Sequence, residues 1–407
     1  MSAPAIPFLP YGKQWIDEAD EAAVLAALRS DYLTTGPAAA AFEEAFAARV
    51  EAKYAVCCSS GTAALHLAAL ALDLSPGEAI VVPALTFLAT ANCARFVGAE
   101  VIFADVDPRT GLMEPHHVEA ALAREAHRGW KPRAIFPVHL NGHCAEVEAL
   151  SAWARARDLA VVEDACHALG GRYGTEPMTP VGDCRHSAMT VFSFHPVKAI
   201  ATGEGGMVTT NDPALRHRLA RLRNHGMTRD AESFQHRESA FDDDGSANPW
   251  YYEMPEAGFN YRLSDIHCAL GLSQLGKLDR FADRRRALAS RYDRLLAPLA
   301  PMIRPVPRPP KSDGGWHLYV VQVDFPALGL TRAQVMHRLK QKGIGTQVHY
   351  LPVNRQPYYR QRYGALSLPG ADAYYAQALS LPLYPSLSDD DVERVAAALV
   401  QLVERTS

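Results

Sequence analysis

The sequence predicts an α/β protein with a large domain, built on a mostly parallel sheet flanked by helices, and a smaller C-terminal α+β domain. From about Ala55 to His225, short apolar runs of strand length alternate with helical stretches. Apolar strands separated by helices are typical of a parallel sheet whose two faces are covered. The chain has 407 residues, which exceeds one ordinary domain. We therefore expect a large domain over residues 1–262 and a smaller one over residues 263–407.

The elements of the large domain can be assigned in chain order. Residues 17–29, DEADEAAVLAALR, predict a capped amphipathic helix, and residues 62–72, TAALHLAALAL, predict a helix after the first strand. Ligands bind at the strand ends of such sheets, so the polar residues there are candidates for a site. The apolar runs of strand length are AVCCSS, AIVVPAL, VIFADV, AIFPVHL, LAVVEDA, AMTVFSF and GGMVTTN.

Two stretches interrupt the alternation. Residues 228–256, rich in Asp, Glu, Ser and Pro, predict an exposed excursion, and the Pro- and Gly-rich residues 301–315 predict a surface connection. The charged block between them, about 263–298, predicts helices. The expected elements of the rest are a strand in LYVVQVDF (318–325), a helix near 331–342 and a helix near 388–404.

Composition and charge exclude several classes of protein. Hydrophobic residues make up 48% and charged residues 21%, as in a soluble globular enzyme. The net charge of −4, with both signs interspersed, provides no basic field for nucleic acid and no polybasic patch for a membrane. No stretch approaches the ~20 uninterrupted apolar residues of a transmembrane helix. The N-terminus lacks the pattern of a signal peptide.

The cysteines indicate a reducing compartment. Their number is odd, they are scattered, and no pair has CxxC spacing. They predict buried thiols of a cytoplasmic protein, not a disulfide framework or a metal site. The seven are Cys57, Cys58, Cys93, Cys144, Cys166, Cys184 and Cys268.

The segment FSFHPVKAIATGEGG, residues 192–206, contains a candidate catalytic lysine. Lys198 follows a predicted strand and precedes a glycine-rich turn and a further strand. Apolar neighbours such as Phe194 and Ile200 would desolvate its amine, which lowers the pKa and leaves a nucleophile. Such an amine can form a Schiff base with an aldehyde cofactor. The alternative is an ordinary lysine that extends to solvent from a strand end.

A second segment, VVEDACHALGG (161–171), ends an apolar strand in two adjacent carboxylates. A carboxylate at the mouth of a parallel sheet can hold a positive charge, such as a protonated pyridine nitrogen. Asp164 is the candidate, and a helix N-cap is its alternative role.

Two further segments are compatible with a ligand site. SSGTAALHLAALAL (59–72) places Ser, Gly and Thr at the start of an apolar helix, where free N–H groups and the helix dipole suit a phosphate. In PALTFLATAN (83–92), Phe87 follows a strand and could stack on a flat ring. The alternative for Phe87 is packing in the core.

Together, in this order and spacing, these segments resemble the sugar aminotransferases of the DegT/DnrJ/EryC1/StrS family of pyridoxal 5′-phosphate (PLP) enzymes. The resemblance covers nearly the whole chain. It implies a fold-type I homodimer with two active sites at the subunit interface, and a large domain that binds the cofactor. It extends through DYLTTGP (31–37), GFNYRLSDIHCALGLSQL (258–275) and GIGTQVHYLPV (343–353).

The resemblance also implies roles at the matching positions. Lys198 holds PLP as a Schiff base and then moves the proton between the substrate carbon and the cofactor. Asp164 pairs with the pyridine nitrogen and His167 lies beside the phenolic oxygen. Phe87 stacks on the ring. The phosphate is held by Ser60, Gly61, Thr62 and Ser193, with Asn260 reaching it from the neighbouring subunit.

The substrate is implied by one departure from the common family pattern. Many members have Gln at the position of His167, whereas the His variant in DACHALGG is typical of a subgroup that acts on UDP-linked 4-keto sugars in pseudaminic acid biosynthesis. The implied reaction moves an amino group from L-glutamate to UDP-2-acetamido-2,6-dideoxy-β-L-arabino-hex-4-ulose, with pyridoxamine 5′-phosphate (PMP) as the cofactor form in the second half-reaction. Candidate contacts to this substrate are Thr35, Arg262, His349 and Tyr350. A core position is the alternative for His349, and a carboxylate across the dimer is the alternative for Arg262.

Three other functions fit parts of the sequence. Sugar dehydratases of this fold replace the Schiff-base lysine, so Lys198 argues against that activity. A non-catalytic regulator that binds PLP would be expected to carry a DNA-binding segment or a basic patch, and neither is present. An aminotransferase for a GDP- or dTDP-linked 4-keto sugar is the main alternative, because pocket residues decide the substrate.

Overall fold

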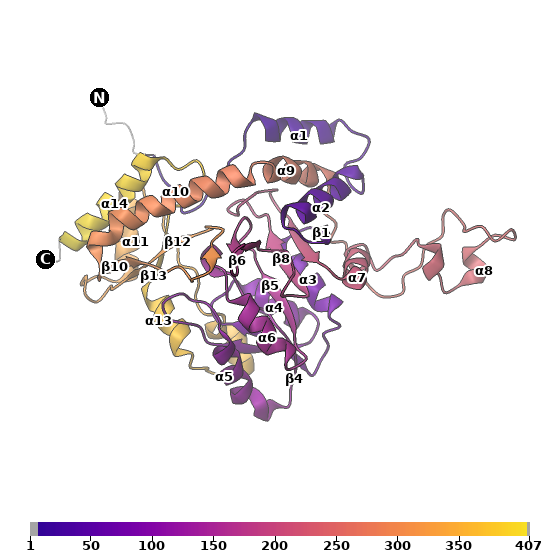
Figure 1. Cartoon of the computed structure of the whole chain (residues 1–407), viewed down its shortest axis with the longest axis horizontal. Helices are drawn as coiled ribbons and strands as arrows, with labels where there is room; N and C mark the ends of the chain where they lie inside the picture. The colour runs from indigo at the N-terminus through magenta and orange to yellow at the C-terminus, as the bar shows by residue number, and fades with distance from the viewer. Residues whose placement is uncertain (1–6, 405–407) are drawn as a thin grey trace.

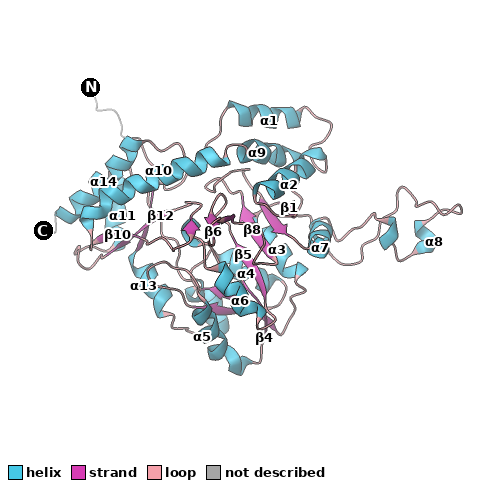
Figure 2. Cartoon of the chain, viewed as in Figure 1, coloured by secondary structure: helices cyan, strands magenta, loops and turns pink. Residues whose placement is uncertain are grey.

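A computed structural model describes residues 7–404 and shows a seven-stranded sheet at the centre of the molecule (Figures 1 and 2). The strand order is β1–β9–β8–β5–β4–β2–β3. The pairs from β8 to β3 are parallel, whereas β9 is antiparallel to both β1 and β8. The strands are β1 (Tyr54–Cys58), β2 (Glu78–Pro83), β3 (Glu100–Ala104), β4 (Lys131–Ile135), β5 (Ala160–Asp164), β8 (Met189–Ser193) and β9 (Gly206–Thr210).

All seven predicted strand runs are present, and the mostly parallel sheet is confirmed. One run is shorter than expected, since β4 ends at Ile135 and not near Leu140. Pro137 has no N–H to donate to a neighbouring strand, so the ladder cannot continue through it. Beyond the proline, Val138 makes only an isolated bridge with Asp164.

Helices flank the sheet. α3 packs on β8 and β9, α2 packs on β1, α5 packs on β3 and α6 packs on β5. The helices are α1 (Glu18–Leu28), α2 (Pro37–Arg49), α3 (Gly61–Ala71), α4 (Leu88–Phe96), α5 (Pro115–Glu125), α6 (Val147–Arg155), α7 (Pro213–Arg223), α8 (Arg237–Ala240), α9 (Asp265–Leu275), α10 (Leu278–Leu296), α11 (Arg332–Gln341), α12 (Pro357–Tyr363), α13 (Pro369–Gln377) and α14 (Asp389–Glu404).

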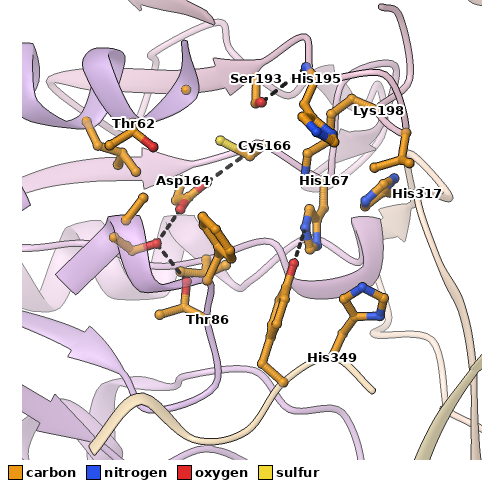
Figure 3. Close-up of a pocket in the computed structure, with 18 of the residues that line it drawn as sticks. Thr62, Thr86, Asp164, Cys166, His167, Ser193, His195, Lys198, His317 and His349 are labelled. Atoms are coloured by element: carbon orange, nitrogen blue, oxygen red, sulfur yellow. Dashed lines mark hydrogen bonds between the residues drawn. The ribbon is translucent and has the colours of Figure 1, made fainter. Parts of the chain in front are cut away.

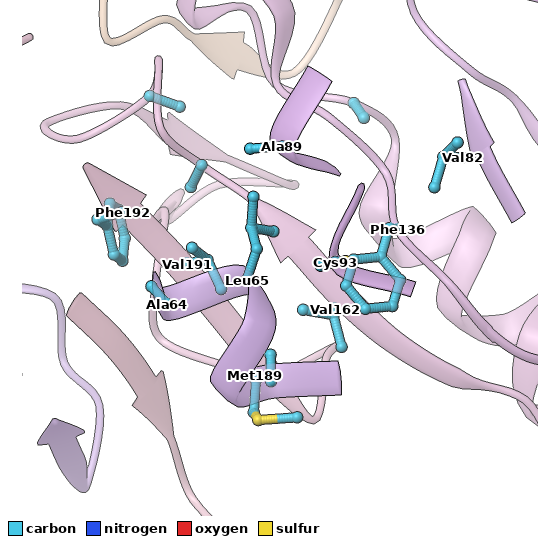
Figure 4. Packing of buried hydrophobic residues seen from close by; sticks show 14 of the residues in the cluster. Ala64, Leu65, Val82, Ala89, Cys93, Phe136, Val162, Met189, Val191 and Phe192 are labelled. Carbon is cyan, nitrogen blue, oxygen red and sulfur yellow. The ribbon is translucent and has the colours of Figure 1, made fainter. Parts of the chain in front are cut away.

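The main core lies between the sheet and the helices that cover it (Figure 4). Leu65 of α3, Cys93 of α4 and Val162 of β5 belong to it and are almost completely buried. Strands covered in this way need apolar side chains along their whole length, which explains the continuous apolar runs in the sequence.

The C-terminal part has its own small sheet and a second core. β10 (Ile303–Pro305), β12 (Tyr319–Val323) and β13 (Ala378–Leu381) pair antiparallel, and side chains of α10, α11 and α14 complete the core. The predicted helices near 331–342 and 388–404 are confirmed. α9, which follows the predicted domain boundary at residue 262, packs on α1 and α2, which precede it. The boundary stays a prediction.

The prediction of a surface connection over residues 301–315 is confirmed for its exposed residues, such as Pro307 and Lys311, but wrong for its buried and paired ones. Ile303 is completely buried and lies in β10, where it fills the second core. Further along, β11 (Ser312–Asp313) pairs with β6 (Arg172–Tyr173), and β6 pairs with β7 (Thr179–Pro180). Pairing partners far away in the sequence therefore order this Pro-rich stretch.

The predicted excursion at residues 228–256 is confirmed. This segment, which contains α8, projects away from the rest of the molecule in Figure 1. Trp250 is 71% exposed and Met254 is 60% exposed on it. This segment, called the arm (residues 228–256) from here on, therefore has apolar side chains exposed on the surface of the single chain.

Helix α1 is present with the predicted cap, but its predicted amphipathic packing is wrong. Asp17 and Asp20 form a reciprocal capping box. Leu25 and Leu28 are about half exposed, whereas Asp20 is completely buried. The Asp20 carboxylate accepts hydrogen bonds from Ser273 Oγ (2.6 Å) and Gln274 Nε2 (2.7 Å) and pairs with Lys277 Nζ at 2.8 Å. Polar contacts to the α9 region therefore hold α1 in place.

The seven cysteines are all free thiols, and six of them are buried. Within residues 7–404, none of the helices combines the length and the apolar character needed to cross a membrane.

The Asp20 contacts predict a large effect of one substitution. Asp20→Ala leaves the Gln274 amide and the Lys277 ammonium without their buried partner, so we expect unfolding free energy to fall by about 2–4 kcal/mol. Urea unfolding, followed by circular dichroism, measures this free energy. Glu18→Ala, at an exposed site on the same helix, is the control and should change the unfolding free energy by less than about 0.5 kcal/mol. Equal unfolding midpoints for the two variants would contradict the prediction.

Candidate active site

A pocket of about 580 Å³ lies where β5 and β8 end, and most of the predicted site residues line it. Its walls come from the start of α3, the loop between β2 and α4, the loops after β5 and β8, and the C-terminal residues 347–350 (Figure 3). The predicted site residues in the lining are Ser60, Gly61, Thr62, Phe87, Asp164, His167, Ser193, Lys198, His349 and Tyr350.

Lys198 lies in the loop after β8. Its backbone N–H donates to the carbonyl of His195 at 2.8 Å, which fixes the turn, and its side chain lines the pocket. Burial lowers the pKa of the Lys198 ammonium, and the nearby Cys166 and Asp164 only partly oppose this effect. The neutral amine, which is the nucleophilic form, is therefore favoured compared with an exposed lysine. The alternative of a side chain extended into solvent does not hold.

The two carboxylates at the end of β5 have different surroundings. Glu163 is completely buried, bonds to His139 Nε2 at 2.9 Å and accepts from Thr190 Oγ1 at 3.1 Å. Asp164 lines the pocket, and its Oδ1 accepts from the backbone N–H of Cys166 at 3.1 Å. Turns, not a helix, follow Asp164, so the N-cap alternative is wrong. Glu163 therefore makes hydrogen bonds inside the core, whereas Asp164 faces the pocket.

The start of α3 lies directly against the end of β8, and glycines permit this approach. A Cβ on Gly61 would lie 2.7 Å from Cβ of Ser193, and one on Gly206 would lie 2.4 Å from the carbonyl oxygen of Ser60. Ser60 caps the helix by accepting from the N–H of Ala63 at 3.1 Å. The first N–H groups of a helix have no acceptor inside it, and its dipole favours an anion there. This junction therefore forms a cradle for a phosphate.

Three histidines from separate parts of the chain meet beside Lys198. The ring centroids of His167 and His317 are 4.4 Å apart, and His349 Nδ1 bonds to Ser380 Oγ at 2.8 Å. Burial, and secondly the charge of Lys198, lowers the pKa of all three, that of His349 to about 3. All three rings are thus neutral near pH 7 and can bond to a ligand without adding charge.

His167 has one partner and one free nitrogen. Its Nε2 bonds to the hydroxyl of Tyr350 at 3.1 Å, while its buried Nδ1 has no partner among the residues that the structure describes. An unpaired buried nitrogen is costly unless a ligand satisfies it. This supports a bound group beside His167.

Phe87 is 55% exposed although it lies at the pocket, with its ring centroid 6.1 Å from that of Tyr350. Core packing, the alternative for this residue, is therefore wrong. An exposed aromatic face at the pocket is suited to stacking on a flat ring.

Three predicted residues are not brought to the pocket by this chain. Thr35 is exposed before α2, Asn260 is exposed after the arm, and Arg262 donates to Asn224 Oδ1 at 2.6 Å. The predicted contacts of these residues to phosphate, sugar or nucleotide stay predictions.

Sequence reasoning missed several pocket residues. Thr86 and Thr90, four residues apart around the start of α4, line the pocket, and Thr90 bonds to Asp164. Their spacing gave no signal, because Thr86 precedes the N-cap Phe87 and only Thr90 lies in the helix. Tyr11 and His317 also line the pocket. They come from distant segments that carry no local signal of a site.

The residues present fit PLP. The cradle suits its phosphate, Asp164 suits a protonated ring nitrogen, and the amine of Lys198 suits its aldehyde. The unpaired Nδ1 of His167 provides a further place for a polar atom of the ring. In the described part of the chain, no group of three or more His, Cys, Asp or Glu side chains is arranged to hold a metal ion.

Comparison with known proteins agrees with this chemistry. Residues 14–400 match the DegT/DnrJ/EryC1/StrS aminotransferase family. The chain is 39% identical to the spore coat polysaccharide biosynthesis protein SpsC of Bacillus subtilis (strain 168) over 402 residues, 98% of this chain and 97% of SpsC.

Solved structures show the same likeness in three dimensions. PseC of Helicobacter pylori, an aminotransferase involved in the biosynthesis of pseudoaminic acid, superposes with a TM-score of 0.86 at 28% identity, covering 98% of this chain and 100% of PseC. The PMP form of Spr1654 of Streptococcus pneumoniae superposes with a TM-score of 0.85 at 27% identity, covering 98% of both chains, and its PLP form is similarly close. The predicted fold-type I architecture and the predicted cofactor, as PLP and PMP, are confirmed. The chain belongs to the DegT/DnrJ/EryC1/StrS aminotransferase family, as a sugar aminotransferase.

Proposed function

We propose that this enzyme moves an amino group from L-glutamate to the position-4 ketone of UDP-2-acetamido-2,6-dideoxy-β-L-arabino-hex-4-ulose. The products are 2-oxoglutarate and UDP-4-amino-4,6-dideoxy-N-acetyl-β-L-altrosamine. The main support for this proposal is that Lys198, Asp164 and the neutral His167 line the same pocket. The likeness to PseC, named for pseudoaminic acid biosynthesis, supports the choice of sugar.

PLP supplies an aldehyde that binds amines covalently and a ring that takes up the electron pair released at the substrate carbon. The protein's own residues do the rest. The cradle of Ser60, Gly61, Thr62 and Ser193 anchors the phosphate, and Phe87 orients the ring. The Asp164 carboxylate keeps a positive charge on the ring nitrogen, which makes the ring a better electron acceptor.

Lys198 Nζ has two tasks. It holds the cofactor between turnovers, and after release it takes or delivers the proton at the substrate carbon. The lowered pKa of Lys198 suits both tasks, since the amine must be neutral to attack and a proton carrier works best when its pKa lies nearer the operating pH. His167 and Tyr350, bonded to each other, orient polar groups on the same side of the pocket.

A homodimer with shared active sites is part of the proposal. Apolar side chains such as Leu28, Leu33 and Trp250 are at least half exposed on the single chain. Such side chains are suited to burial against a second copy. A second copy could also bring Asn260 and Arg262, which lie outside this chain's own pocket. The seven free thiols fit a reducing location such as the cytoplasm.

The substrate can be tested in single turnover. The protein is first converted to its PMP form with L-glutamate, and the return of the PLP absorption band is followed after adding a UDP-, GDP- or dTDP-linked 4-keto-6-deoxy sugar. We expect a rapid return with the UDP sugar alone. Return only with a GDP or dTDP sugar would keep the aminotransferase and overturn the substrate. Failure of the glutamate step would overturn the donor.

Lys198→Ala should lower turnover by about 10³-fold or more, because it removes both the covalent anchor and the proton carrier. The folded dimer should persist, as measured by circular dichroism and light scattering. Lys131→Ala removes an exposed lysine at the start of β4 and is the matched control, with turnover close to wild type. Comparable turnover of Lys198→Ala and wild type would refute the catalytic role.

The lowered pKa of Lys198 sets the pH dependence of cofactor capture. Only the neutral amine attacks an aldehyde, and burial moves the pKa below the ordinary 10.5, so the reactive fraction rises at a lower pH than for an exposed lysine. The rate of PLP uptake by PLP-free protein, followed by absorbance, should level off below pH 10.5. N-acetyllysine methylamide serves as the unburied reference. Identical pH profiles for protein and reference would contradict the shift.

A further inference from the structure

Thr90 of α4 makes a hydrogen bond to the carboxylate of Asp164. Thr90 Oγ1 lies 2.6 Å from Asp164 Oδ2, and Thr90 is completely buried. The other carboxylate oxygen, Oδ1, accepts from the backbone N–H of Cys166 at 3.1 Å. Each oxygen therefore has its own donor, and two contacts on different oxygens fix both the position and the rotation of the carboxylate.

The direction of the threonine hydrogen bonds follows from counting protons. An ionised carboxylate can only accept hydrogen bonds, so the Thr90 hydroxyl must donate its single proton to Asp164. Thr90 Oγ1 also lies 2.7 Å from Thr86 Oγ1, and it can then only accept from that hydroxyl. Figure 3 shows this relay as dashed lines that run from Asp164 to Thr86. Successive hydrogen bonds in one direction polarise and strengthen each other.

The surroundings of Asp164 explain what the hydrogen bond from Thr90 contributes. A buried carboxylate loses hydration, and donors to its charged form compensate for that loss. Thr90 also lies in the first turn of α4, where the positive end of the helix dipole favours a nearby negative charge. The contact therefore both places the carboxylate and stabilises its charged form.

We propose that Thr90 is a positioning residue, backed by Thr86, that holds the Asp164 carboxylate in place and aims it at the ring nitrogen of the cofactor. The inference rests on the role of Asp164 in the proposed function. The competing interpretation is that Thr90 merely ties α4 to β5. A structural tie would affect thermal stability, whereas a positioning role also affects the cofactor.

Thr90→Val tests the proposal, because valine keeps the shape and removes the hydroxyl. Loss of a hydrogen bond to a charged group should weaken PLP binding to PLP-free protein by about tenfold or more. The value of kcat should also fall, because the carboxylate is no longer held in place at the ring nitrogen. Fluorescence titration with PLP and steady-state kinetics measure the two effects.

Two further variants make the result specific. Thr90→Ser keeps the hydroxyl and should restore both PLP affinity and kcat. Thr86→Val leaves the Thr90 hydroxyl free to donate to Asp164 and should cause a smaller loss than Thr90→Val. Thermal melting of each variant separates a folding defect from a defect at the cofactor.

The outcomes separate this inference from the proposed function. If Asp164→Asn loses PLP affinity while Thr90→Val behaves like wild type, the role of Thr90 is overturned and that of Asp164 stands. If Thr90→Ser is as defective as Thr90→Val, the hydroxyl is not the cause and the inference also fails. If Asp164→Asn binds PLP like wild type, the role assigned to Asp164 fails first. The identity of the sugar does not enter, since PLP binding is measured without substrate.

Discussion

The parallel pairing of β5 with β8 is the contact on which the site depends. Val162 to Asp164 lie in register with Met189 to Val191, so both strands end at one edge of the sheet. This brings Asp164, at the end of β5, and Lys198, shortly after β8, into one pocket although they are 34 residues apart by number (198 − 164). The strand alternation separates the two carboxylates, so Glu163 joins a buried network with His139 while Asp164 faces the pocket. A slip of one residue would exchange them and remove the carboxylate from the site.

Close packing at the start of α3 sets the second constraint. Gly61 and Gly206 allow the helix start to touch the end of β8, because a Cβ at either position would collide with Ser193 or with the backbone of Ser60. The anion cradle and the lysine loop thus share one strand. A ligand held at the cradle therefore lies near Lys198, which the loop after β8 places through the hydrogen bond from its N–H to His195.

Burial gives the pocket its electrostatic character. Burial is the first cause of the lowered pKa values of Lys198, His167, His317 and His349, so the three imidazoles are neutral near pH 7 and the neutral form of Lys198 is more accessible than in an exposed lysine. A neutral amine can attack, and neutral imidazoles can bond without competing for protons. On the opposite side, Asp164 keeps two donors that compensate for its lost hydration. The pocket therefore brings together a desolvated amine and a hydrogen-bonded carboxylate, which fits the role proposed for each of them.

The sequence by itself determined the sheet and the residues that follow single strand ends, and the resemblance of these ordered segments to a known family added the cofactor. Lys198, Asp164 and the Ser60–Thr62 helix start were recognisable as candidates, because a strand end and a helix start are local patterns, and the family resemblance supplied their expected roles. Thr90, His317 and Tyr11 were not singled out, since their positions depend on how α4, the segment before β12 and the N-terminal segment pack around the pocket. The amphipathic interpretation of α1 failed for the same reason, because the buried partners of Asp20 lie some 250 residues away. Local sequence encodes the elements, but only the packed chain decides which side chains face each other, because each contact between distant segments depends on all the others that close the core.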